Sequence, residues 1–372
     1  MNLHLLLDYD TLKLIWWALL GVLLIGFAIL DGFDLGMAML LPFVARTDTQ
    51  RRVLLNTVGP VWEGNQVWFI LGGGAVFAAW PVLYATAFSG FYFAMLLVLA
   101  ALIVRPVGFD YRSKVEHKTW RAVWDWTLCI GGLVPSLVFG VAFGNLFEGV
   151  PFKFDDFMRM TYTGTLFDLL NPFALLCGVV SVLMLATHGA TFLLVKTEGV
   201  IAQRARKVAT KLPLLLVATL AIASWWGTRL DGYVYEHGTV TKAAGAWWQV
   251  YARLPATMVP FMFALGLPML VAFFARKKHD GLAFILSSLM VASIIANAGL
   301  TLFPFLLPSS LAPNASLTIW NASSSHLTLF IMLCAVVIFL PLIGCYTAWV
   351  YRVMRGKVTE EHMQEQPGKT IY

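Results

Sequence analysis

The stretch LIWWALLGVLLIGFAILDGFDLGMAMLLP, residues 14–42, decides the fold of this chain. It contains no Lys or Arg, and its only charged side chains are Asp31 and Asp34. A helix that crosses a bilayer needs about 20 mostly apolar residues. The stretch is too long for the apolar core of a signal peptide, and it lacks a small-residue cleavage pattern. It therefore predicts a membrane-spanning helix.

The composition of the whole chain agrees with this interpretation. Of the 372 residues, 59% are apolar and 12% are charged, whereas soluble domains carry about 25% charged residues. So low a charge density excludes an ordinary soluble fold, and the many aliphatic and aromatic residues exclude disorder. The apolar runs are about twice as long as the roughly 10-residue strands of a membrane barrel, which favours helices.

Nine segments have the length and apolarity of a membrane-spanning helix. They are residues 14–42, 57–81, 83–105, 122–144, 169–195, 212–230, 256–275, 281–303 and 326–351. We predict an all-α, polytopic membrane protein with about nine transmembrane helices. Residues 1–351 would form a single transmembrane domain, and residues 352–372 would form a polar cytoplasmic tail.

Lysine and arginine side chains gather on alternate sides of these segments. Twenty of the 26 basic residues fall on one side and six on the other. Loops rich in Lys and Arg stay in the cytoplasm. We therefore expect the N-terminus outside and the C-terminus inside, which requires an odd number of crossings. The net charge of +6 is then explained by the basic loops on the cytoplasmic side. We therefore expect no nucleic-acid partner.

The sequence offers little for metal binding. The cysteines form no CxxC pair, and His188 is the one histidine well inside a predicted span. A bis-ligated haem needs two axial ligands. We expect no metal site in this chain, and we interpret His188 as a hydrogen-bonded packing residue.

Ionisable residues inside the apolar spans carry the functional information. The set comprises Asp31, Asp34, Glu63, Arg105 and Asp125. Each costs about 2.5–3.5 kcal/mol at the centre of a membrane helix, so each needs a partner, water or a function. All five lie toward the predicted cytoplasmic ends of the first four spans. A proton path from the cytoplasm that leads sideways to a reaction centre elsewhere fits this placement.

Two interpretations of these residues stay open. Arg105 and one carboxylate could form a purely structural pair, with Asp31 helping to cap or kink the helix at Gly32. Alternatively, four acids facing one base leave carboxylates without a compensating charge. Such groups favour the neutral form and can load and release protons.

Long motifs of the chain resemble subunit II of the cytochrome bd-type quinol oxidases. They include WWALLGVLLIGFAILDGFDLG (16–36), WEGNQVWFILGGGAVFAAWP (62–81) and AFSGFYFAMLLVLAALIVRPVGFDYRSK (87–114). Later pieces, such as GVAFGNLFEGVPF and NASLTIWNASSSHLTL, agree in order. The resemblance covers nearly the whole chain.

The resemblance implies a complex in the bacterial cytoplasmic (inner) membrane. In this family a haem-bearing subunit I pairs with subunit II, often with small single-span subunits. The complex oxidises quinol and reduces dioxygen to water, which generates a proton motive force. Haem b and haem d are ligated by subunit I, so no catalytic residue is expected here. Subunit II is expected to fold as two four-helix bundles plus a peripheral helix, and some members hold a quinone such as ubiquinone.

The polar residues of the family motifs match this sequence one by one. They fall on Asp31, Asp34, Arg105, Asp110 and Asp125. Glu63 stands where the family often has Asp, so the carboxylate is kept and its reach grows by one methylene. Trp62 and Asn65 of the same motif are expected to serve in packing.

We predict a hydrated proton route lined by carboxylates, with Arg105 as their charge partner. Its residues are Asp31, Asp34, Glu63, Asp110 and Asp125. One rival hypothesis is a purely structural subunit that stabilises subunit I and binds lipid or quinone. A second is an independent proton-coupled permease, against which the missing internal repeat and the one-sided cluster argue.

Overall fold

The computed structural model describes residues 7–365, and its elements are almost all helices. The helices are α1 (Tyr9–Val44), α2 (Asp48–Val58), α3 (Trp62–Ala79), α4 (Pro81–Gly90), α5 (Tyr92–Tyr111), α6 (Lys118–Glu148), α7 (Pro172–Lys196), α8 (Gly199–Gly227), α9 (Ala246–Arg253), α10 (Met258–Arg276), α11 (Asp280–Leu302), α12 (His326–Val353) and α13 (Glu360–Glu365). Six short strands form three two-stranded hairpins. The all-α prediction is confirmed.

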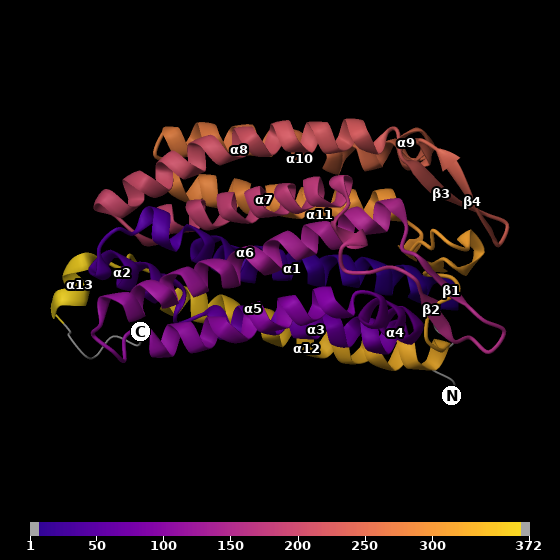
Figure 1. Ribbon diagram of the computed structural model, residues 1–372, viewed down its shortest axis with the longest axis horizontal. Coiled ribbons are helices and arrows are strands. Elements are labelled where there is room, and N and C mark those ends of the chain that lie inside the picture. The colour runs from indigo at the N-terminus through magenta and orange to yellow at the C-terminus, as the bar shows by residue number, and fades with distance from the viewer. Residues whose placement is uncertain (1–6, 366–372) are drawn as a thin grey trace.

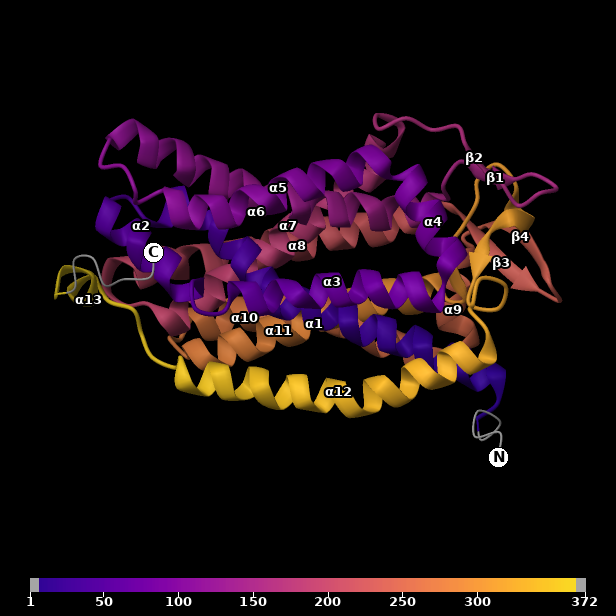
Figure 2. The same cartoon turned by 90° about the horizontal axis from the view of Figure 1, so that it is seen from below.

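Eight helices in the described part of the chain are long and apolar enough to cross a membrane. They are α1, α5, α6, α7, α8, α10 with the short turn before it, α11 and α12. Helix α3, with 18 residues, falls within the second predicted segment, residues 57–81. It is less apolar because it begins with the polar sequence WEGNQ, yet it runs along α1 over its whole length (Figure 2).

The third predicted span, residues 83–105, differs from the structure at both ends. Pro81 starts the separate helix α4, and α5 begins only after Phe91, whose backbone leaves the helical region. Helix α5 then continues to Tyr111 with a proline inside it. Arg105 therefore lies about 9 Å inside its helix, at 1.5 Å per residue, and not at its end. From this position the Arg105 side chain reaches a buried carboxylate of α1.

The long helices fall into two groups of four with one helix outside them. Helices α1, α3, α5 and α6 form the first group, and α7, α8, α10 and α11 form the second. Helices α1 and α6 both pack on α7, which joins the groups. Among the long helices of the described chain, α12 packs appreciably against α1 and α3 alone. It runs along the edge of the molecule (Figure 2). This arrangement matches two four-helix bundles plus a peripheral helix.

The two ends of the molecule have different structures (Figure 1). One end carries the hairpins β1–β2 (Phe152–Phe154, Met160–Tyr162), β3–β4 (Asp231–Glu236, Thr239–Ala244) and β5–β6 (Phe305–Leu307, Leu317–Thr318). The hairpins follow the predicted spans 122–144, 212–230 and 281–303. These connections lie on the side with few Lys and Arg residues, which the sequence predicts to be outside. At this end hydrogen bonds from the backbone N–H and the hydroxyl of Thr165 lower the pKa of the exposed Asp168 carboxyl group.

The opposite end carries α2 and α13 (Figure 1). Residues 354–365, part of the predicted tail, fold back toward the bundle. The backbone N–H of Val358 donates to the Lys196 carbonyl at 2.8 Å, and Met363 of α13 is buried against α2. Residues 366–372 lie outside the described part of the chain.

Helices α1 and α7 cross at two glycines that face each other. A Cβ atom on Gly36 would overlap the carbonyl oxygen of Leu185, and one on Gly189 would come within 2.5 Å of the Met37 nitrogen. Small residues permit such close backbone approach between membrane helices. The two helix groups therefore meet backbone to backbone at this depth.

We expect Gly36→Ala to lower the thermal stability of the purified protein, because its new methyl group must push α1 and α7 apart. Overpacking of this kind costs about 1–3 kcal/mol. Gly21→Ala on the same helix is the matched control, since a Cβ there meets no atom within 4 Å. The midpoint of thermal unfolding in detergent measures both. Equal midpoints would contradict the close crossing.

Candidate functional site

A buried ion pair joins α1 to α5. Arg105 donates from Nη1 to Asp31 Oδ2 at 3.1 Å and from Nη2 to Asp31 Oδ1 at 2.9 Å. Both side chains are at most 1% exposed. Two parallel hydrogen bonds of this kind fix geometry as well as charge. Asp31 is therefore the carboxylate that Arg105 neutralises.

Asp34 lies one helical turn further along α1 and has a different environment. The Asn65 side chain donates from Nδ2 to Asp34 Oδ2 at 2.8 Å. The Tyr351 hydroxyl donates to Asn65 Oδ1 at 2.7 Å, so the amide can turn only its NH₂ group toward Asp34. Asp34 is 1% exposed, and its Oδ1 atom has no hydrogen-bond partner among the described residues. Helices α1, α3 and α12 thus meet around one carboxyl group.

Asp34 differs from Asp31 in its charge partners. Arg105 is already engaged twice by Asp31, and no basic side chain is bonded to Asp34 within the described residues. A lone carboxylate in an apolar surrounding is costly, and taking up a proton removes the charge. The vacant acceptor Oδ1 is the atom at which a proton or a water molecule would bind.

Asp125 belongs to a second cluster of charges, at the end of the bundle near α2. Arg112 Nε donates to Asp125 Oδ1 at 2.6 Å, and Arg51 Nη1 donates to Asp125 Oδ2 at 2.6 Å. Arg112 and Arg121 also bind Asp48, at 2.9 and 2.8 Å. Three guanidinium groups therefore face two carboxylates. The sequence hypothesis made Arg105 the charge partner of Asp125. In the structure Asp125 is instead bound by Arg112 and Arg51.

Glu63 and Asp110 are exposed, unlike the other acids of the predicted route. Trp62 stacks on Phe109 with ring centroids 5.4 Å apart, so the next residue of each helix, Glu63 and Asp110, lies at the same end of the bundle. The Trp62 side chain is buried. Asn65 does more than pack, because it bonds directly to Asp34.

Sequence reasoning missed three charged partners and one hydroxyl. Arg112 stands in the quoted motif RPVGFDYRSK, so its motif position could have revealed it. Asp48 and Arg51 lie in α2, a polar helix that is too short to be one of the predicted spans. Tyr351 lies 286 residues from Asn65, and no local pattern predicts that contact.

The membrane histidine of this chain does not fit an axial haem ligand. His188 is fully buried; its Nε2 lies 2.9 Å from the Ile29 carbonyl oxygen and its Nδ1 lies 2.8 Å from the Ser287 hydroxyl. Nε2 must donate to the carbonyl, so Nδ1 accepts from the hydroxyl. Both ring nitrogens are then occupied. The described residues also contain no cluster of three or more His, Cys, Asp or Glu side chains suited to a metal ion.

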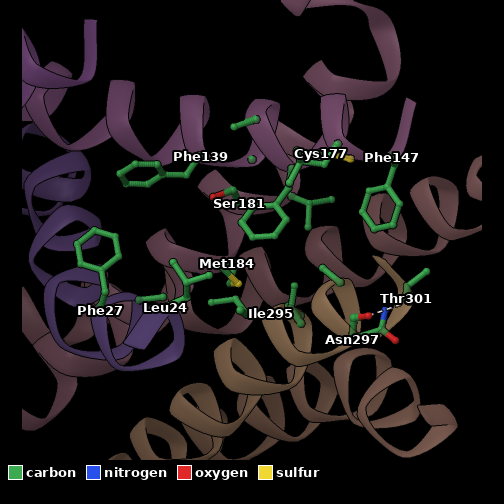
Figure 3. A pocket seen from close by; sticks show the side chains of 18 of the residues that line it. Leu24, Phe27, Phe139, Phe147, Cys177, Ser181, Met184, Ile295, Asn297 and Thr301 are labelled. Carbon is green, nitrogen blue, oxygen red and sulfur yellow. Dashed lines mark hydrogen bonds between the residues drawn. The ribbon is translucent and has the colours of Figure 1, made fainter. Parts of the chain in front are cut away.

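A large apolar cavity occupies the half of the molecule near the hairpins. Its volume is about 470 Å³, and side chains from both helix groups line it. Figure 3 shows Phe27, Phe139 and Met184 around its apolar part and Asn297 with Thr301 at one end. The Tyr251 hydroxyl donates to Asn297 Oδ1 at 2.9 Å, which completes this polar end. An apolar body with a polar terminus suits such a space.

Comparison with known proteins gives a family match over almost the whole chain. The model of the family described as cytochrome bd terminal oxidase subunit II matches residues 12–354. A protein of Escherichia coli (strain K12), cytochrome bd-I ubiquinol oxidase subunit 2, is 49% identical and covers 96% of this chain and 98% of its own length. A Haemophilus influenzae protein named probable cytochrome oxidase subunit 2 is 46% identical over 95% of this chain and 97% of its own.

A solved structure shares the fold. One chain of the bd oxidase from Geobacillus thermodenitrificans superposes with a TM-score of 0.67 at 16% identity. The match covers 92% of this chain and 98% of that chain. The helix arrangement described above is therefore one already seen in an oxidase of this type.

We expect Arg105→Gln to destabilise the protein strongly, because Asp31 would be left buried without its partner. Breaking a buried ion pair from one side costs about 3–5 kcal/mol. Arg121→Gln is the control, because its side chain is 26% exposed and exposed pairs contribute about 0–1 kcal/mol. The double variant Asp31→Asn/Arg105→Gln should recover part of the loss. Thermal unfolding measures all three, and equal losses for the two single variants would contradict the assignment.

Proposed function

This chain belongs to the cytochrome bd terminal oxidase subunit II family, and from that premise we propose that it delivers cytoplasmic protons toward the interface with subunit I. It is a multi-pass protein of the bacterial inner membrane and a subunit of a quinol oxidase complex. Reduction of dioxygen to water consumes protons, and a subunit with membrane-embedded carboxylates is suited to supply them. Haem b and haem d of the complex would then be ligated by subunit I alone, in keeping with the occupied nitrogens of His188.

The observation that carries the proposal is the contrast between two acids on one helix. Asp31 is paired with Arg105, whereas Asp34, three residues on, has one oxygen bound by a neutral amide and the other without a hydrogen-bond partner among the described residues. A group that cycles between charged and neutral forms must not be locked into either. Asp34 meets that condition, and we assign it the proton-loading role.

The other acids of the route take different roles in this proposal. Glu63 and Asp110 are exposed at the same end of α3 and α5, so they can collect protons from water. Asp31 with Arg105 sets the electrostatic potential around Asp34. Asp125 is bound by Arg51 and Arg112 and so joins the cytoplasmic ends of the helices.

The face of α3 is the proposed contact with subunit I. Glu63 is exposed on this face although it begins a predicted span, and lipid is a poor environment for a charged group. Gly74 is exposed, and a Cβ added there would meet no atom within 4 Å. An exposed glycine leaves room for a helix of another subunit to approach closely. Small single-span subunits would bind elsewhere on the lipid-facing surface.

We further propose that the apolar cavity holds a quinone such as ubiquinone as a structural ligand. Its volume of about 470 Å³ and its apolar lining fit an isoprenoid tail. The Asn297–Thr301–Tyr251 cluster offers hydrogen bonds to ring oxygens (Figure 3). The cavity lies between both helix groups, so a ligand there would brace one against the other.

A purely structural subunit is the second candidate function. It is favoured by the number of acids that are paired, since Asp31 and Asp125 both carry their own guanidinium partners. In that case Asp34 would serve only to hold α3 and α12 through Asn65. Substitutions at Asp34 and Glu63 separate the two functions.

We expect Asp34→Asn to slow dioxygen reduction by about tenfold or more, since proton transfer by a positioned side chain contributes roughly 10²–10⁴-fold. The amide keeps the size and the Asn65 contact but cannot carry a proton. Glu63→Gln should also slow turnover, to a smaller degree, because Asp110 remains. Oxygen consumption with reduced quinol is the measurement, and haem absorption should stay normal. Lost haem and lost assembly would instead support the structural function.

Glu236→Gln serves as the control for these variants, because Glu236 is 62% exposed at the hairpin end. Its turnover should equal that of the unmodified complex. Unchanged turnover in Asp34→Asn would exclude the proton-loading role.

We expect Ile295→Trp to remove the quinone that copurifies with the complex, because the larger ring fills the cavity that Ile295 lines. Ile285→Trp is the matched control: it makes the same change on the same helix at a side chain that is 57% exposed. Solvent extraction followed by chromatography measures the bound quinone per haem. Equal quinone in both variants would place the ligand elsewhere.

A further inference from the structure

A second cavity lies at the opposite end of the molecule, beneath the residues that follow α12. We call residues 354–358 the strap. The cavity has a volume of about 280 Å³ and lies between the strap, the end of α2 and the ends of α7 and α12. Thr57, Val61 and Tyr351 are among the residues that line it. This end carries the basic loops, so the cavity opens on the predicted cytoplasmic side.

Two hydrogen bonds hold the strap over the cavity. The Lys196 ammonium group donates to the Met354 carbonyl at 2.6 Å, and the Val358 N–H donates to the Lys196 carbonyl at 2.8 Å. Beyond the strap, α13 packs on α2, where Gln50 donates to Glu360 at 3.3 Å. The strap is therefore fixed near both of its ends, each time to Lys196.

The cavity reaches the Asp34 site through one residue. Tyr351 lines it and also donates to Asn65, which in turn donates to Asp34. Phe192 lines the cavity as well and stacks on Phe33, with ring centroids 4.0 Å apart. Tyr351 and Asn65 therefore link the cavity lining to the Asp34 carboxyl group through two hydrogen bonds.

We propose that the cavity beneath the strap is the water inlet through which Asp34 exchanges protons with the cytoplasm. The proposal rests on the proton-loading role of Asp34 and adds a path that does not pass Glu63 or Asp110. A water molecule occupies about 30 Å³ in the liquid, so the cavity has room for roughly nine. Water beside Tyr351 has to move only past the Asn65 contact to reach Asp34 Oδ1.

The chemistry of the lining selects water over other species. Asn65 is an amide that does not ionise, so it positions Asp34 and the protons travel on water. Lys196, Arg355 and Lys357 give the rim a positive charge. Positive groups at a pore mouth repel cations, hydronium included, while neutral water passes. The proton carriers that can approach this inlet are therefore neutral or anionic.

Cysteine accessibility in the assembled complex tests the inlet. The variant Val61→Cys is made in a background in which the four native cysteines are replaced by alanine. Inside-out membrane vesicles expose the cytoplasmic face to a sulfonated, membrane-impermeant methanethiosulfonate reagent. We expect the thiol at position 61 to react, and turnover after labelling to fall by about tenfold relative to the same unlabelled protein. Comparison within one preparation removes any effect of the substitution on folding.

The control is Thr210→Cys on α8, whose side chain lies outside the cavity lining. It should react without loss of turnover. Absence of reaction at position 61, or reaction with unchanged turnover, overturns the inlet. If Asp34→Asn is nevertheless slow, the proton-loading role stands and its water comes by way of Glu63. If Asp34→Asn is as fast as the unmodified complex, the proposed function and the inlet fail together.

Discussion

A charge buried within a bilayer needs an opposite charge in contact with it, and the pair of Asp31 and Arg105 meets that need in this molecule. Its two hydrogen bonds fix the rotation and height of α5 against α1. The pair lies within both helices and not at their ends, so it joins α1 to α5 inside the first helix group.

With Arg105 saturated, Asp34 is left to neutral partners. Its neighbours come from α3 and α12, so the peripheral helix contributes to the polar centre through Tyr351 although little of it is buried. The five acids of the predicted route are thereby divided by environment: two are bound to guanidinium groups, two face outward, and one is buried with no cation bonded to it among the described residues. That division gives each carboxylate a different capacity to change charge, and it is the basis of the proton-delivery proposal.

The same helices serve two purposes along their length. Toward α2 and α13 they hold the polar centre and the wetted cavity, and toward the hairpins they enclose an apolar cavity of about 470 Å³. Glycine contacts between α1 and α7 hold the two helix groups in contact.

The sequence by itself determined the membrane class, the all-α fold and the family, because apolar length and long ordered motifs are local properties of the chain. It also identified Asp31, Asp34 and Arg105, since charges are conspicuous in an apolar span. It could not determine which carboxylate Arg105 binds, nor that Asp125 is held by Arg51 and Arg112. Nor could it place Tyr351 beside Asn65 or show the two cavities. Those features depend on how helices distant in sequence rotate against one another, and only the packed structure fixes that rotation.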